Sequence, residues 1–253
     1  MRRFATLTLV LFAGTLAFAQ APITPPKPAK KISRKEAEAY NAMVQATDSD
    51  SRIKLANDLV TNFADTQFKG MALFIEADAY LRKGDNDKAI VFAEQSVEAD
   101  PKSYQALVLL AKTYAATTHI NDLDKQEKLT KAEKYANDAL EILKTVDKPN
   151  PKMTDAEWST AKGDFEGQCY MALGIAAAFR NKVDDATADF QKVSELDVEP
   201  ADLIRCARVL IDTHKPDQAI VWLDKAIANP NASPQIKNIA TNDKARAQSM
   251  IKK

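Results

Sequence analysis

The sequence places few reactive side chains in arrangements that support catalysis or metal binding. Its two histidines, His119 and His214, lie far apart in the chain. It contains no His-Glu-x-x-His zinc motif, no Gly-x-Ser-x-Gly nucleophile motif, and neither of the common glycine-rich phosphate loops. Asp184 and Asp185 precede a predicted helix, where acidic residues complement the partial positive charge of a helix N-terminus. We therefore expect no enzyme, no cofactor and no metal site.

Composition instead favours a helical protein. The chain has 253 residues, of which 45% are hydrophobic, enough to form a core and to exclude wholesale disorder. Its 35 basic and 35 acidic residues balance, so no charge excess points to nucleic acid or to an anionic membrane surface. Only 6 glycines and 7% aromatic residues, together with abundant alanine, are typical of closely packed helices.

The first 19 residues have the pattern of a secretion signal. Arg2-Arg3 is a short cationic segment, residues 4–18 are apolar or small, and Ala17-Phe18-Ala19 fits the small-x-small cleavage rule. A transmembrane anchor is the alternative, but the apolar stretch of about 15 residues is shorter than the roughly 20 that span a bilayer. The chain has no cysteine near the cleavage site, so it lacks the pattern of a bacterial lipoprotein. We expect cleavage after Ala19 and a periplasmic or secreted chain with no integral membrane segment.

Residues 20–32 follow as a predicted linker. Four prolines within residues 21–31 oppose helix formation and favour an extended backbone. We favour an unstructured spacer over a ligand for a proline-binding domain. Removal of the two leader arginines leaves 33 basic and 35 acidic residues, a net charge of −2.

A repeated spacing of small and aromatic residues begins near residue 70. If Gly70 is position 1, six marker residues fall at positions 8, 11, 15, 20, 24 and 32: Ala77, Tyr80, Gly84, Ala89, Ala93 and Pro101. This spacing resembles the tetratricopeptide repeat, a 34-residue helix–turn–helix unit. Small residues at positions 8 and 20 let two antiparallel helices approach closely, glycine suits the turn, and proline ends the second helix.

The spacing recurs along the chain. Four units cover about residues 70–103, 104–148, 167–200 and 200–233, preceded by a degenerate helix pair at 33–66. Ser233-Pro234 has the pattern of a helix start, and a polar helix at 234–250 is suited to capping an open end. We expect residues 33–253 to form an all-α, right-handed α-solenoid of antiparallel helix pairs, a tetratricopeptide-like superhelix.

Two irregularities interrupt the repeats. Residues 119–131 form an insertion in the second unit that could lengthen its second helix. Thr154 and Glu157 form a predicted capping box, which opens a helix that could run to Phe179. These segments are either protrusions that contact a partner or ordinary variation in loop length.

Both cysteines fall on first helices of adjacent units. Cys206 replaces a core leucine at position 7, whereas Cys169 is at position 3 of its unit. We expect two buried thiols, with a disulfide between them as the alternative that export favours.

The family resemblance implies a site for a protein or peptide partner. In tetratricopeptide repeats, positions 2, 5, 9 and 12 of the first helices line a concave groove. The carboxylate clamp of lysine, asparagine and arginine that the family resemblance implies for chaperone docking is absent here. Position 5 predicts an exposed apolar stripe, unless the superhelix is tight and these residues pack on each other. The candidate partner-binding residues are Met71, Phe74, Asp78, Leu81, Val108, Lys112, Met171, Ile175, Phe179, Ile204, Arg208 and Ile211.

The sequence therefore predicts an exported, non-catalytic scaffold that binds a protein or peptide partner. A structural or assembly component of a stable cell-envelope complex is the alternative. An enzyme is the least favoured class, because no insertion carries histidine, cysteine and paired acids together.

Overall fold

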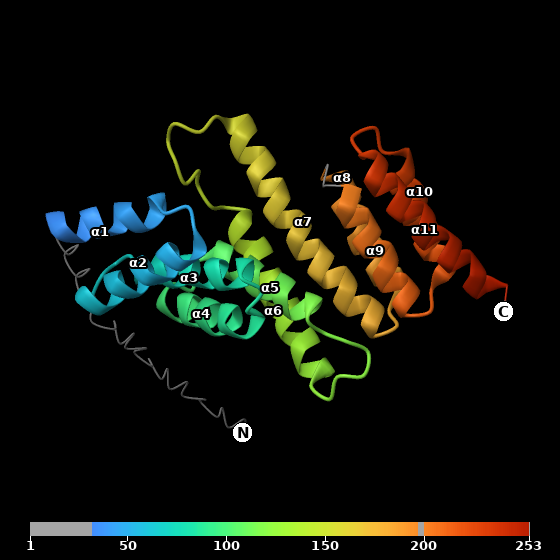
Figure 1. The fold of residues 1–253 in the computed structure, drawn as a ribbon, viewed down its shortest axis with the longest axis horizontal. Coiled ribbons are helices and arrows are strands. Elements are labelled where there is room, and N and C mark those ends of the chain that lie inside the picture. Colours follow the sequence, from blue (N-terminus) through green and yellow to red (C-terminus); the bar gives the residue numbers. More distant parts are fainter. Residues whose placement is uncertain (1–31, 197–199, 253) are drawn as a thin grey trace, which may run out of the picture. The chain divides into compact units, whose positions relative to one another are not determined.

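The computed structural model describes residues 32–196 and 200–252, all of which belong to one compact unit at residues 32–253. The predicted secretion signal and residues 20–31 of the predicted linker lie outside the described residues. The described residues form eleven α-helices and no strand (Figure 1). The helices are α1 (Arg34–Gln45), α2 (Ser49–Asn62), α3 (Lys69–Arg82), α4 (Asn86–Ala99), α5 (Tyr104–Ala116), α6 (Lys125–Leu143), α7 (Asp155–Phe179), α8 (Val183–Glu195), α9 (Pro200–Asp212), α10 (Pro216–Ala228) and α11 (Pro234–Ile251).

Consecutive helices pack as pairs, and the pairs stack in chain order, as an α-solenoid requires. The all-helical solenoid prediction is confirmed. Helix starts follow local chemistry: the Ser33 and Ser233 hydroxyls accept hydrogen bonds from N–H groups of the first turns of α1 and α11. Helix α11 ends the described stack by packing on α10 and α9.

The turn inside a helix pair has the same geometry in three repeats. Gly84, Asn181 and His214 each occupy position 15 and have φ values of 79°, 60° and 60°. In each turn the N–H of position 16 donates to the carbonyl of position 11, at 3.0, 2.9 and 2.7 Å respectively. This is the left-handed helix end that favours glycine. The backbone therefore supports the residue numbering that was derived from small and aromatic side chains.

Close contact between paired helices depends on small residues at positions 8 and 20. Ala77 and Ala89 are fully buried where α3 and α4 pack. The pair α7/α8 packs closely with a different combination of residues. Gly174 occupies position 8, and Phe190 takes the place of the alanine at position 24. A Cβ atom on Gly174 would lie 2.3 Å from Cε1 of Phe190. The missing methyl group makes room for the ring.

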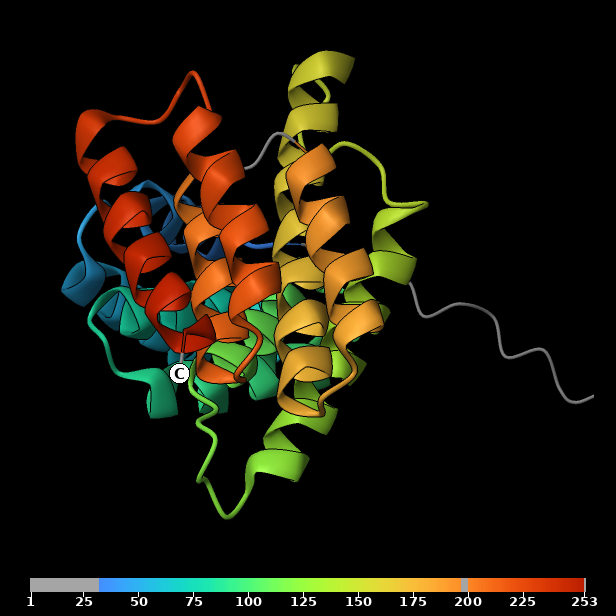
Figure 2. The same ribbon diagram turned by 90° about the vertical axis from the view of Figure 1, so that its right-hand side faces the viewer.

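The first helices of successive pairs form an inner layer. Helix α5 packs on α7 and α7 packs on α9, whereas no comparable contacts join α4, α6, α8 and α10 to one another in the described part of the chain. Figure 2 looks along the stack from the end formed by α10 and α11, with the helices of the earlier repeats behind them. First helices that lie closer together than second helices define the inner side of a superhelix.

The two irregular segments, residues 119–131 and the helix that begins after Thr154, have different structures. Residues 117–124 form a loop, and α6 begins at Lys125 and has 19 residues, so the insertion lengthens both the loop and the helix. Helix α7 has 25 residues and starts with the predicted capping box, in which the Glu157 N–H donates to the Thr154 hydroxyl and the Thr154 N–H donates to the Glu157 carboxylate. The long helix to Phe179 is confirmed.

Candidate partner-binding surface

The twelve candidate residues differ widely in exposure. Arg208 is exposed. Seven are half-buried, namely Met71, Phe74, Asp78, Leu81, Lys112, Met171 and Phe179. Four are buried, namely Val108, Ile175, Ile204 and Ile211.

The expected continuous apolar stripe at position 5 is wrong at two of its four members. Val108 and Ile204 are only 2% and 3% exposed. The reason is the direct packing of α5 on α7 and of α7 on α9, which brings inner-layer side chains against the neighbouring repeat. Phe74 and Met171 keep partial exposure while packing against the core. The accessible part of this face is therefore a set of separate cavities.

Two of the three charged candidates have ion-pair partners within the chain. Asp78 accepts from Arg52 at 3.1 Å and from Arg82 at 2.8 Å. Arg208 on α9 pairs with Asp243 on α11 at 2.7 Å. The pairs with Arg52 on α2 and with Asp243 on α11 each join two helices, which gives Asp78 and Arg208 a structural role.

Lys112 differs from them because its ammonium group has no ion-pair or hydrogen-bond partner among the described residues. It lines a cavity of 360 Å³, which we call the central cavity, between α5, α7, α8 and α9. Burial lowers the pKa of Lys112, and Arg205 and Arg82 act in the same direction, whereas Asp78 opposes them. The rest of its lining is Asp164, Gly167, Gln168, Met171, Val193, Asp202 and Arg205.

A second cavity lies further along the same inner layer. It has a volume of 520 Å³, and its apolar wall includes Ile175 and Phe179 from α7 and Ile211 from α9. The two histidines of the chain, His119 and His214, both line it, and we therefore call it the histidine cavity. The remaining lining residues are Ala115, Ala116, Thr118, Ile120, Val209, Asp212, Arg246 and Met250.

A cavity of 1060 Å³ lies at the start of α3 and α5, and Met71 is the candidate residue in its lining. Its wall includes Tyr40 and Phe68, whose rings stack with centroids 4.1 Å apart. Five other candidate residues line the central cavity and the histidine cavity. The candidates chosen from the sequence therefore lie mainly at those two cavities of the inner layer.

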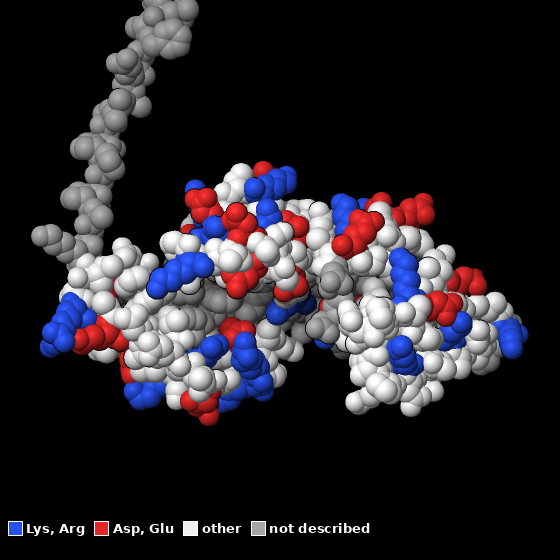
Figure 3. Space-filling view, turned by 90° about the horizontal axis from the view of Figure 1, so that it is seen from above, with Lys and Arg blue, Asp and Glu red and all other residues white. Residues whose placement is uncertain are grey.

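Charge does not single out one surface in the view of Figure 3. Acidic and basic side chains are interspersed over this face, and neither sign forms a continuous patch there. Charge on that face therefore does not identify a binding surface.

Comparison with known proteins decides the family. The tetratricopeptide-repeat family model matches residues 72–103, the unit in which the repeat spacing is clearest. Residues 72–103 of the chain are therefore a tetratricopeptide repeat. A search of curated proteins returns no match.

The search of solved structures finds proteins that match most of this chain. TTC0263, a repeat protein from Thermus thermophilus, is 17% identical, with a TM-score of 0.50 over 86% of this chain and 96% of that one, and it shows the same fold. A MamA RS-1 double mutant is 14% identical, with a TM-score of 0.45 over 78% and 95%. A tetratricopeptide repeat protein from Parabacteroides merdae is 15% identical, with a TM-score of 0.37 over 85% and 91%.

The described part of this repeat protein contains two free, buried thiols, as predicted for Cys169 and Cys206. The Sγ atom of Cys206 lies 3.6 Å from Sδ of Met171. Burial raises the pKa of the Cys169 thiol to about 12 and also raises that of Cys206. Among residues 32–196 and 200–252, no three histidine, cysteine or acidic side chains gather as a metal site would need. No helix in those ranges has the length and apolarity to cross a membrane.

Sequence reasoning missed the meeting of His119 and His214 in one cavity. The residue numbering placed His214 at a turn, but the insertion after α5 removed any fixed position for His119. It also missed Asp164 and Arg205, which lie on the same inner layer as Lys112 but at other repeat positions.

Proposed function

We propose that this chain is an exported, non-catalytic scaffold that binds a protein or peptide partner on the inner layer formed by α5, α7 and α9. The observation that carries the proposal is the pair of adjacent cavities on that layer, which contain five of the candidate residues. Tetratricopeptide repeats are generally interaction scaffolds, and that general role supports the same interpretation. Export rests on the pattern of residues 1–19.

Lys112 is the group that we expect a partner to contact in the central cavity. A half-buried ammonium group without an internal anion is desolvated without full compensation. A carboxylate or carbonyl oxygen from a partner would supply the missing interaction. Arg205, whose side chain is 69% exposed, lies on the same cavity and pairs with Asp202 at 2.6 Å, so its charge is already balanced within the chain.

Site-specific photo-cross-linking tests the surface directly. A cross-linking amino acid in place of Gln168, in the central cavity, should capture one partner band in the cell envelope. The same amino acid in place of Val91, which is 49% exposed on the second helix α4, should not. Equal capture from both positions would contradict the proposal. A stoichiometric complex that survives purification would favour the envelope-assembly alternative over a transient scaffold.

A charge reversal tests the role of Lys112. Lys112→Glu should reduce capture at Gln168 by about tenfold, since one charge-assisted contact is worth about 1.5–3 kcal/mol. Lys54→Glu, at an exposed site on α2, is the matched control and should leave capture unchanged. For export, mass spectrometry of the exported protein should find Gln20 as the first residue, and an intact Met1 would contradict that part of the proposal.

A further inference from the structure

The two histidines of the chain converge on one cavity although 95 positions separate them in the sequence (214 − 119). His119 comes from the loop after α5, and His214 comes from the turn after α9. Both residues are exposed, and neither imidazole has a hydrogen-bond partner within the described residues. Each ring is therefore available to a ligand that enters the histidine cavity.

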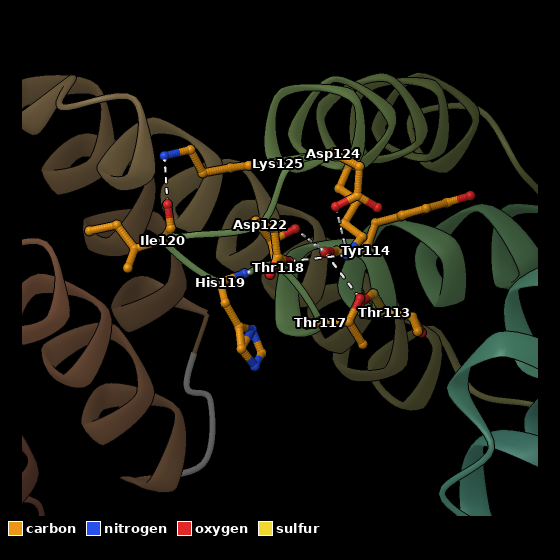
Figure 4. A network of polar contacts seen from close by, with 10 residues as sticks. Thr113, Tyr114, Thr117, Thr118, His119, Ile120, Asp122, Asp124 and Lys125 are labelled. Atoms are coloured by element: carbon orange, nitrogen blue, oxygen red, sulfur yellow. Dashed lines mark hydrogen bonds and ion pairs between the residues drawn. The ribbon is translucent and has the colours of Figure 1, made fainter.

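The loop that carries His119 is held by a network of polar contacts (Figure 4). The His119 N–H donates to Oδ2 of Asp122 at 3.0 Å, and the same carboxylate pairs with Lys128 at 3.1 Å. Lys125 Nζ donates to the carbonyl oxygen of Ile120 at 2.9 Å. Figure 4 shows the His119 ring pointing away from this network, with no dashed line reaching it. The network fixes the backbone and leaves the imidazole free.

His214 is held in another way. It has a φ of 60°, at the repeat position where Gly84 has a φ of 79°. A side chain at this angle is less favourable than glycine, and the tight bond from Lys215 N to Leu210 O keeps the turn in place. The fold thus keeps a histidine at the cavity edge where glycine would be the more stable residue.

The cavity combines an apolar wall with charge that depends on pH. Phe179, Val209 and Met250 are half-buried and line it, and its volume of 520 Å³ lies within the usual range for ligand sites. Asp212 on α9 and Arg246 on α11 line it as an ion pair at 3.5 Å and cancel in charge. Helices α5 and α7 contribute no charged side chain to its lining. The two remaining polar rings are histidines, the residue type that normally changes charge between pH 5 and 8.

From this convergence we infer that the histidine cavity binds a partner segment in which a large apolar side chain stands next to a carboxylate, and that it binds this segment more tightly in mild acid. The apolar side chain would contact the wall of Phe179, Val209 and Met250. The carboxylate would meet the protonated imidazoles of His119 and His214. This inference rests on the proposed scaffold function and names the chemistry of its partner.

The test uses the full chain and the dye 1-anilinonaphthalene-8-sulfonate, an apolar fluorophore with one negative charge. We expect saturable binding that is about tenfold tighter at pH 5.5 than at pH 7.5, as two nearby cations would give at the edge of a cavity. The neutral dye Nile red should show no such pH dependence. Circular dichroism and melting curves at both pH values establish that the fold is the same.

Three variants assign the effect to the cavity. The double variant His119→Gln, His214→Gly should bind the anionic dye equally at both pH values, with the affinity that the unchanged protein has at pH 7.5. Met250→Ser should weaken both dyes at both pH values, and the control Val221→Ser, at a site 54% exposed on α10, should change nothing. If tenfold pH dependence persists in the histidine double variant, or if Met250→Ser binds as before, the inference is wrong.

A peptide pair tests the nature of the occupant. Acetyl-Leu-Phe-Asp-amide should compete with the dye at pH 5.5 about tenfold better than acetyl-Leu-Phe-Asn-amide, and the two should compete equally at pH 7.5. Equal competition at both pH values would overturn the inference. Photo-cross-linking from Gln168 does not involve the histidines, so success there beside failure here would leave the scaffold function in place.

Discussion

Gly174→Ala should destabilise the protein although it replaces glycine in the middle of a helix. The new Cβ atom would lie 2.3, 2.5 and 3.1 Å from three ring carbons of Phe190. The ring is fully buried and meets Trp222 edge-on, with centroids 6.0 Å apart, so it has no free space to move into. Either the ring or the backbone of α7 must shift.

Two opposing contributions determine how far Gly174→Ala changes the free energy of unfolding. Overpacking of a closed site costs about 1–3 kcal/mol, and contacts this short place Gly174→Ala at the upper end. Replacing glycine by alanine inside a helix returns about 1 kcal/mol. We therefore expect a net loss of about 2 kcal/mol, or about 4–8 °C in melting temperature for a unit of this size.

The same substitution elsewhere in α7 is a matched control. A Cβ atom on Gly163 would meet only Cδ2 of Leu196, at 3.9 Å. Gly163→Ala should therefore raise stability by about 0.5–1 kcal/mol. Urea and thermal unfolding followed by circular dichroism compare both variants with the parent. If Gly174→Ala melts at or above the parent temperature, the argument from close contact fails.

A second substitution tests the proposed cause. Phe190→Leu shortens the side chain that meets residue 174. It should destabilise the parent, because it leaves a cavity, and should cost much less in the Gly174→Ala background. A coupling energy of about 1 kcal/mol or more between the two positions is expected for residues in direct contact. Additive effects would show that the ring is not what excludes the methyl group.

Three further predictions concern single residues. Gly84→Ala should cost about 1 kcal/mol by urea denaturation, although its Cβ atom would meet nothing within 4 Å, because its φ is 79°; Asn181→Gly should not destabilise. Burial raises the pKa of Glu76 to about 7 from 4.5, so the stability penalty of this residue is absent below pH 4.5, grows between pH 4.5 and 7, and stays constant above that range. Glu76→Gln should therefore be about 3 kcal/mol more stable than the parent at pH 8, with little difference at pH 4, and a difference in melting temperature that does not change with pH would contradict this. Thiol titration without a reductant should find two thiols, Cys169 and Cys206, after denaturation and almost none before it; zero after denaturation would indicate a disulfide.

Local chemistry made the helix ends predictable from the sequence. Thr154 with Glu157, and Ser233 with Pro234, are patterns whose hydrogen bonds involve only the next three residues. The left-handed turn at position 15 was recognised from the sequence only at Gly84, because glycine is the usual residue in such a turn. Asn181 occupies the same position without being glycine. The number of residues from the start of each repeat would have identified all three turns.

The exposure of the inner layer could not be predicted in the same way. Repeat positions tell which side of a first helix faces inward, but they do not tell how closely the next first helix approaches. Val108 and Ile204 are buried because α5, α7 and α9 touch directly. That approach depends on side chains from several repeats together, and a local pattern carries no information about it. The central cavity formed by Lys112 and Arg205 depends on the same approach.

Position 15 finally connects the stability of the repeat with its proposed binding chemistry. Gly84 meets the backbone requirement without a side chain, whereas Asn181 and His214 both belong to the residue types that adopt positive φ more often than others but less readily than glycine. His214 adds a larger ring in the same conformation, and that ring makes no hydrogen bond within the described residues. A local cost without a local compensation is what sites of function commonly show. His214→Gly should therefore raise stability by about 0.5–1 kcal/mol while removing part of the acid-dependent dye binding. If His214→Gly lowers stability, the ring has a structural role, and the case for a ligand at this turn is lost.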